Sequence, residues 1–190
     1  MRPIIDHFFN HITANPIELY SEFGLQHELA LFVRMNYADH KVRLEYNVKR
    51  INQNLVNLVK WELDLHVTSS NGETSVIEFK MPKSDSGTPA EMYSAIKDIK
   101  FLEQLENVVD NRYAILVTNN VAFWNAPRAN ANIYHFFNGN EINISSLLHE
   151  HTPAFLHNKE EIILNNQYHA EWQELNDIDG VFWKYYIIEV

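Results

Sequence analysis

The spacing of apolar residues predicts two helices at the start of the chain. Apolar residues recur every three or four positions within the first dozen residues, which is typical of a short amphipathic helix. Asn15, Pro16 and Glu18 then match the N-cap, N1 and N3 positions of a second helix. We expect this second helix to run from about residue 16 to residue 37.

The next part of the chain alternates apolar and polar residues, the pattern of half-buried strands. Three such segments cover residues 42–48, 60–68 and 74–81. The last two are separated by the turn sequence Ser-Ser-Asn-Gly at residues 69–72. The pattern therefore predicts three consecutive strands, the last two joined as a hairpin.

A capped helix and an almost wholly apolar strand follow. Thr88 and Pro89 occupy N-cap and N1 positions, and an apolar stripe continues over residues 88–107, which predicts a long helix. Residues 112–118 are nearly all apolar, which indicates a strand buried on both faces.

The predicted order over residues 17–118 is therefore helix, three strands, helix, strand. This order implies an α/β fold whose central mixed sheet is flanked by helices. We expect residues 119–190 to form a β-rich C-terminal extension, and the whole of residues 1–190 to be one domain. The strand-like segments of the extension are 132–137, 161–164, 167–172 and 181–189, with a short helix near 144–148.

The composition is that of an ordinary globular protein. Its 190 residues are 46% hydrophobic and 21% charged, which excludes collagen-like and disordered chains. The sequence has no Cys, which excludes disulfides, Cys-bound zinc and thiol nucleophiles. No apolar run approaches the roughly 20 residues of a membrane span, and the first residues lack the apolar core of a signal peptide. We therefore expect a cytoplasmic protein.

The charge of the chain is unevenly distributed. Fifteen Lys and Arg face 25 Asp and Glu, a net charge of −10, so the basic surplus typical of nucleic-acid-binding proteins is missing. Residues 41–83 nevertheless carry more basic than acidic side chains, whereas residues 129–190 are strongly acidic. The middle of the chain can therefore meet a polyanion, and we expect the acidic region to face away from it.

The turn of the predicted hairpin determines which polar side chains face each other. A three-residue loop with Gly72 in the left-handed conformation places Asp64 directly opposite Glu78. Cross-strand Cβ atoms lie roughly 5 Å apart, so both carboxylates could reach one divalent cation. A two-residue turn would instead pair Asp64 with Phe79 and separate the carboxylates.

An acidic residue on one strand, followed by Glu-x-Lys on the next, resembles the active-site motif of the PD-(D/E)XK nuclease superfamily. The matching residues are Asp64 and the tripeptide Glu78-Phe79-Lys80. The predicted element order is also similar to the αβββαβ core of the restriction-endonuclease-like fold. The resemblance covers about residues 17–118, and it departs from the family pattern in that no Pro precedes Asp64.

The resemblance implies a Mg²⁺- or Mn²⁺-dependent endonuclease that hydrolyses DNA phosphodiester bonds, of the defence, restriction or repair type. Asp64, Glu78 and the main-chain carbonyl of Phe79 would bind the metal. Lys80 would position or deprotonate the attacking water, and Glu28 on the first core helix would assist. Two carboxylates suffice because Mg²⁺ keeps several of its waters.

Plainer interpretations of these residues also exist. Asp64 and Glu78 can be solvated residues of an edge hairpin. Glu28 lies among apolar neighbours, where it is either directed at the site or paired with a residue such as Arg43. One face of the helix over residues 88–107 is either simply solvated or a ridge that contacts phosphates. The residues of that face are Tyr93, Lys97, Lys100 and Gln104.

Two other function classes stay open at this point. One is a non-catalytic module on a nuclease fold, similar to an immunity protein or antitoxin, which binds protein or nucleic acid. The net negative charge favours it, because phosphate contacts need cations. The other is a subunit whose DNA surface is completed by homodimerisation or by a basic partner. The presence of all three of Asp64, Glu78 and Lys80 favours the catalytic interpretation.

Overall fold

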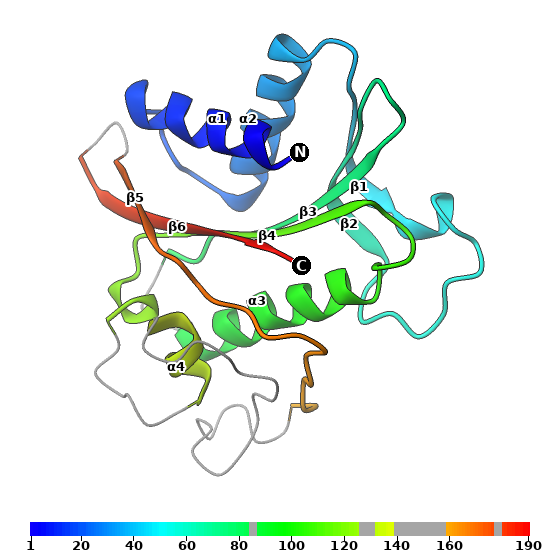
Figure 1. Ribbon diagram of the computed structural model, residues 1–190. Coiled ribbons are helices and arrows are strands. Elements are labelled where there is room, and N and C mark those ends of the chain that lie inside the picture. The colour runs from blue at the N-terminus through cyan, green and yellow to red at the C-terminus, as the bar shows by residue number, and fades with distance from the viewer. Residues whose placement is uncertain (84–86, 126–131, 139–158, 177–179) are drawn as a thin grey trace.

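The computed structural model describes residues 1–83, 87–125, 132–138, 159–176 and 180–190 (Figure 1). The helices are α1 (Arg2–Ala14), α2 (Glu22–Asn36), α3 (Thr88–Glu103) and α4 (Asn132–Asn138), with short 3₁₀ turns η1 (Val48–Arg50) and η2 (Val121–Phe123). The strands are β1 (Lys41–Asn47), β2 (Glu62–Thr68), β3 (Thr74–Lys80), β4 (Asn111–Thr118), β5 (Gln173–Asn176) and β6 (Phe182–Glu189).

The strands form one mixed six-stranded sheet in the order β1-β2-β3-β4-β6-β5. Strands β1, β2 and β3 pair antiparallel, as consecutive strands joined by short connections usually do. Helix α3 crosses back over the sheet, so β3 and β4 pair parallel. The fold is therefore α/β, and the order α2-β1-β2-β3-α3-β4 is the one predicted from the sequence.

Helices cover both faces of the sheet. Helices α1 and α2 lie on one face, and α3 and α4 lie on the other (Figure 1). Each face buries its own apolar core, because a sheet with helices on both sides must be apolar on both sides. The first core includes Phe8, Phe9, Leu29, Leu65 and Phe79. The second core, beneath α3, includes Val76, Ile96, Leu102, Leu116 and Tyr186.

The second helix begins later than the sequence predicted. Helix α2 starts at Glu22, and the Ser21 hydroxyl accepts a hydrogen bond from the backbone N–H of Gly24 at 3.0 Å. Asn15 instead ends α1, and its backbone N–H donates to the carbonyl of His11. The expected start at Asn15 was therefore wrong, because Ser21 provides an equally good N-cap six residues further on.

The start of α3 agrees more closely with the prediction. The N-cap residue is Gly87, whose φ of 77° is left-handed, and Thr88 is the first helical residue. The Thr88 hydroxyl accepts a hydrogen bond from the Asn120 side chain at 2.9 Å. This bond ties the start of α3 to the segment that follows β4.

The C-terminal region is less rich in strands than predicted. Residues 132–137 belong to α4, and neither 161–164 nor 167–172 forms a strand. Only the segment 181–189 was predicted correctly, as β6. The predicted short helix near 144–148 lies outside the described residues. Residues 132–137 and 167–172 contain aromatic side chains, which favour strands locally but here pack into the second core.

Within the ranges given above, no helix is both long enough and apolar enough to cross a membrane.

Candidate functional site

The hairpin of β2 and β3 has the predicted register. The backbone N–H of Ser69 donates to the carbonyl of Glu73 at 2.9 Å, and Gly72 has a φ of 89°. Leu65 lies opposite Ile77, so the next step along the strands brings Asp64 to Glu78. The alternative of a two-residue turn is therefore excluded.

The regular ladder ends where the site begins. Backbone pairing between β2 and β3 stops at Leu65 and Ile77. One residue further, Oδ2 of Asp64 accepts a hydrogen bond from the backbone N–H of Phe79 at 2.7 Å. The Asp64 side chain thus takes a place that a backbone carbonyl would otherwise fill, and this bond holds its carboxylate beside β3.

The pleat of β1 and β2 also breaks at this point. Leu44 and Leu65 pack into the core beneath α1 and α2, whereas their pleat neighbours Tyr46 and Leu63 pack into the core beneath α3. Between them, Glu45 has a φ of 47°, which is left-handed and uncommon for Glu. The strict alternation expected over residues 60–68 would place Leu63 and Leu65 on one face; this expectation was wrong, because the alternation of β2 reverses at Asp64.

Glu78 is the most deeply buried acidic residue of the site, with only 1% of its surface exposed. Its Oε2 forms an ion pair with the Lys60 ammonium, and its Oε1 has no hydrogen-bond partner among the described residues. Burial raises the pKa of Glu78 well above its ordinary value, the Asp64 carboxylate raises it further, and Lys60 opposes both. One oxygen of Glu78 therefore remains available for a further ligand.

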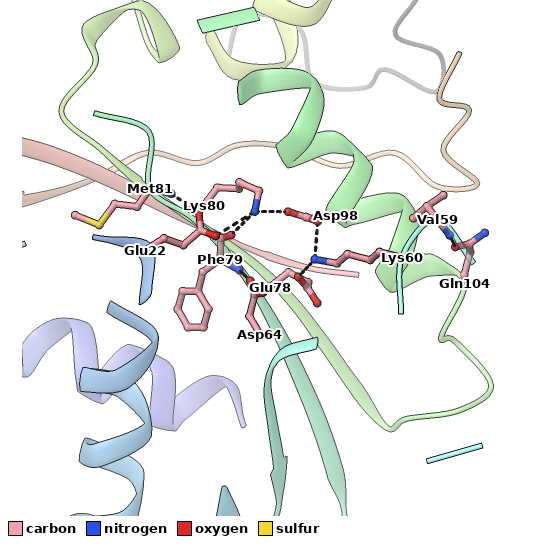
Figure 2. A network of polar contacts seen from close by, with 10 residues as sticks. All are labelled: Glu22, Val59, Lys60, Asp64, Glu78, Phe79, Lys80, Met81, Asp98 and Gln104. Carbon is pink, nitrogen blue, oxygen red and sulfur yellow. Dashed lines mark hydrogen bonds and ion pairs between the residues drawn. The ribbon is translucent and has the colours of Figure 1, made fainter. Parts of the chain in front are cut away.

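Asp98 of α3 links two lysines across the site (Figure 2). Its Oδ1 lies 2.8 Å from Nζ of Lys60, and its Oδ2 lies 3.0 Å from Nζ of Lys80. Burial alone would lower the pKa of each lysine. Glu78 and Asp98 nevertheless raise the pKa of Lys60 above its ordinary value, and Asp98 and Glu22 do the same for Lys80. Both lysines are therefore held as ammonium ions.

Lys80 also contacts the backbone of its own strand. Its Nζ donates a hydrogen bond to the Phe79 carbonyl at 2.9 Å, and this carbonyl is the one expected to bind a metal. The structure thus brings together four of the predicted site residues, namely Asp64, Glu78, Phe79 and Lys80.

Glu28 is not part of this group. It is half-buried in the middle of α2, and among the described residues it has no hydrogen-bond or ion-pair partner. The carboxylate that α2 contributes is that of Glu22, whose Oε1 lies 3.3 Å from Nζ of Lys80 and whose Oε2 accepts from the N–H of Met81 at 3.2 Å. The later start of α2 explains this change, since it places Glu22 in the first turn, beside the end of β3.

The expected phosphate-contacting face of α3 is largely occupied by the protein itself. The Tyr93 hydroxyl donates to the Glu160 carbonyl at 2.7 Å, and Nζ of Lys100 donates to Oδ1 of Asn165 at 2.9 Å. Lys97 is exposed. This face of α3 therefore carries the C-terminal segment rather than lying beside Asp64 and Glu78.

The sequence analysis missed Lys60 and Asp98 as members of the site. A signal for Asp98 was present, because it lies three residues after Ala95 and four before Leu102, within the buried stripe of α3. A carboxylate in such a stripe needs a charged or hydrogen-bonding partner. Lys60 gave no comparable signal, because its partners Glu78 and Asp98 lie far away in the sequence.

The donors of the site suit a hard divalent cation. Asp64 and Glu78 supply carboxylate oxygens from adjacent strands, Phe79 supplies a carbonyl, and Oε1 of the buried Glu78 lacks a partner among the described residues. No cluster of three or more His, Asp or Glu side chains arranged to hold a metal occurs in the described part of the chain. Two carboxylates and a carbonyl fit Mg²⁺, which is usually held by few protein ligands and several waters.

Comparisons with known proteins do not identify the chain. No family model matches it, and no curated protein matches it. A solved structure described as "Crystal structure of SSO0001" aligns with 50% of this chain and 44% of its own length, at 18% identity and a TM-score of 0.28. This chain therefore spans less than half of that structure's length, and so slight a likeness carries no argument.

Proposed function

We propose that this protein is a metal-dependent nuclease that hydrolyses DNA phosphodiester bonds at the site formed by Asp64, Glu78, Phe79 and Lys80. The observation that carries the proposal is that Asp64 meets the buried Glu78 on adjacent strands of a helix-flanked sheet, with Lys80 two residues after Glu78. This arrangement resembles the PD-(D/E)XK nucleases in residue types, order and element sequence.

The residues of the chain have separate roles in this proposal. Asp64 and Glu78 hold Mg²⁺ or Mn²⁺ together with the Phe79 carbonyl. The bound metal supplies a water of lowered pKa and neutralises charge on the phosphate. Asp64 is oriented by the Phe79 N–H, so its second oxygen can turn toward the metal. Glu22 holds the ammonium of Lys80 near the Phe79 carbonyl.

The charge state of Lys80 favours one of its two expected roles. Asp98 and Glu22 stabilise its ammonium form, so its pKa is raised rather than lowered. A lysine in this state donates hydrogen bonds but does not accept a proton. In the metal-free protein Lys80 is therefore a hydrogen-bond donor, and we assign it to orienting the attacking water and to stabilising negative charge on the phosphate oxygens.

The test of this proposal is cleavage of supercoiled plasmid DNA with Mg²⁺ or Mn²⁺, with and without EDTA. Wild type should nick the plasmid only with metal. Lys80→Ala should lose cleavage but still bind Mn²⁺, whereas the matched variant Lys184→Ala, on β6, should cleave normally. Equal cleavage by wild type and Lys80→Ala would show that the activity comes from a contaminant.

A second candidate function is a binding module that uses this fold without catalysis. The net charge of −10 favours it, as does the engagement of both site lysines with carboxylates of the same chain. DNA binding at low salt with Ca²⁺ in place of Mg²⁺ separates the two candidates. Failure to bind or cleave DNA under these conditions would favour a protein-binding module or a nuclease that needs a basic partner.

A further inference from the structure

The two site lysines contact the side chain and the carbonyl that would bind the proposed metal. The Lys60 ammonium contacts Oε2 of Glu78, and the Lys80 ammonium contacts the Phe79 carbonyl at 2.9 Å. Both ammonium groups also contact Asp98, one at each carboxylate oxygen (Figure 2). Asp98 is therefore a shared partner that is not itself among the proposed metal ligands.

We propose that Lys60 is a resident cation of this site, which neutralises Glu78 in the metal-free protein and passes to Asp98 when a divalent cation binds. This inference rests on the proposed function, because it assumes that Asp64 and Glu78 hold a metal. In it Asp98 is a positioning residue, since it contacts neither metal nor substrate but receives the ammonium groups that leave the ligand oxygens.

The geometry allows this exchange with little movement. Lys60 contacts Glu78 and Asp98 at the same time, with Oδ1 of Asp98 at 2.8 Å from its Nζ. Lys60 would therefore give up one contact and keep the other. The side chain of Asp98 is only 8% exposed, so without the lysines its negative charge would be buried and unpaired.

The charges of the site fit one divalent cation. Among the described residues, the carboxylates of Glu22, Asp64, Glu78 and Asp98 lie near two ammonium groups, those of Lys60 and Lys80. When all four carboxylates are ionised, they exceed the ammonium groups by two negative charges, which equals the charge of one Mg²⁺ or Mn²⁺. The lysines alone therefore leave the site incompletely neutralised, which favours uptake of a divalent cation.

A second set of contacts fixes the position of Lys60 relative to Asp98. The backbone N–H of Val59 donates to Oε1 of Gln104 at 3.0 Å, and Nε2 of Gln104 donates to the Asn57 carbonyl at 3.1 Å. Gln104 is the C-cap residue of α3, the helix that carries Asp98. The segment before β2 is thus fastened to that helix, so the position of Lys60 is set by structure rather than by a chance surface contact.

The experiment is calorimetric titration of the full chain with Mn²⁺ in the absence of DNA. Lys60→Met keeps the length and apolar stem of the side chain but removes the competing charge, and it should tighten the Mn²⁺ dissociation constant by about tenfold. Lys60→Gln should act in the same direction and serves if Lys60→Met does not fold. Lys41→Met removes an exposed lysine of β1 and should leave the constant within about twofold.

The role of Asp98 is tested by the opposite effect. Asp98→Asn should weaken Mn²⁺ binding by about tenfold. The ammonium groups of Lys60 and Lys80 would then lose their shared carboxylate partner and would compete more strongly with the metal for its ligands. In the Lys60→Met background, Asp98→Asn should weaken Mn²⁺ binding by much less than tenfold. A merely structural role of Asp98 would give the same loss in both backgrounds, because the two substitutions would then act independently.

The outcomes separate this inference from the proposed function. If Asp64→Asn abolishes Mn²⁺ binding but both Lys60 variants leave it unchanged or weaker, Lys60 is not a competitor, and the metal site stands without it. Equal tightening by Lys41→Met would also overturn the inference, because the effect would then come from overall charge. If wild type binds no Mn²⁺ at all, both the metal site and the inference fail.

Discussion

At the residue scale, Asp64 and Glu78 hold their carboxylates in place by different means. Asp64 uses one oxygen to accept the N–H of Phe79, and this bond orients the group without neutralising it. Glu78 is buried and depends on the charge of Lys60. Since the Asp64 carboxylate raises the pKa of the buried Glu78, the charge of Glu78 is less costly to the apo protein when Asp64 is neutral.

Asp64→Asn should abolish metal-dependent cleavage while leaving the fold intact. The amide oxygen of Asn can still accept the Phe79 N–H, and loss of one negative charge beside Glu78 should preserve or slightly raise the apo stability. Asp64→Ala, which lacks an acceptor, should instead unfold more easily by about 1 kcal/mol. Plasmid cleavage and urea unfolding measure the two effects, and equal stability of the two variants would contradict the role of this hydrogen bond.

Glu45→Gly should stabilise the protein. Glu45 has a φ of 47°, which costs a residue with a Cβ more than it costs Gly. The greater entropy of Gly in the unfolded chain offsets part of the gain, so the net increase should be about 0.5–1 kcal/mol. Glu62→Gly, at an exposed strand position with no left-handed φ, is the control and should be destabilised. Thermal unfolding reports both, and destabilisation of both variants would argue against strain at Glu45.

At the element scale, α3 joins three parts of the molecule. Asp98 reaches the site, and Gln104 fastens the segment before β2. Glu103, on the same helix, accepts the backbone N–H groups of Asn165 and Asn166 and the hydroxyl of Tyr168. The C-terminal segment is thus attached to the helix that organises the site, although it contributes no residue to it.

Glu103→Ala should destabilise the protein by about 3 kcal/mol, because it removes a buried acceptor that the buried Tyr168 hydroxyl and two backbone N–H groups share. Glu103→Gln keeps an acceptor oxygen in a similar position and should therefore lose less stability than Glu103→Ala. Chemical denaturation would measure the difference in unfolding free energy, provided that this free energy depends on denaturant concentration with the same slope in all variants. If both variants lost the same small amount, the bonds from Asn165, Asn166 and Tyr168 would contribute little to folding.

At the scale of the whole molecule, charge is the property that most limits DNA binding. Thirteen of the 15 basic residues precede residue 129. The structure engages Lys60 and Lys80 with carboxylates, and Lys83 with the carbonyl and ring of Tyr20. Few lysines near the site are therefore unengaged, so phosphate contacts should be few and bound metal should contribute much of the attraction.

DNA affinity should consequently rise with divalent cation and depend only weakly on salt. Each phosphate contact adds about 0.9 to the slope of log affinity against log salt concentration, so a site with two or three contacts should give a shallow slope. Fluorescence anisotropy with labelled DNA and Ca²⁺, over a range of NaCl concentrations, measures this slope. A steep slope, equivalent to six or more phosphate contacts, would instead indicate an extended basic surface. We expect the acidic C-terminal region to face away from the DNA.

The parts of the fold that were predicted correctly depend on local signals. The three-residue turn ending at Gly72 determined the hairpin register, and with it the approach of Asp64 to Glu78. The apolar run of β4 and the stripe of α3 were equally local. For the start of α2 the sequence pattern indicated Asn15, whereas the structure uses Ser21. Glu22, in the first turn of α2, contacts Lys80, which the sequence pattern did not predict.

The sequence by itself therefore determined the order of elements over residues 17–118 and the pairing of the two central carboxylates, because both follow from turn geometry and periodicity within a few residues. Only the tertiary structure decided the partners of those carboxylates. Lys60 and Asp98 meet because α3 packs across the sheet, and the pleat reverses at Asp64 because β1 and β2 serve two different cores. Such contacts join residues far apart in the chain, and burial makes each charge depend on a partner that no local pattern reveals.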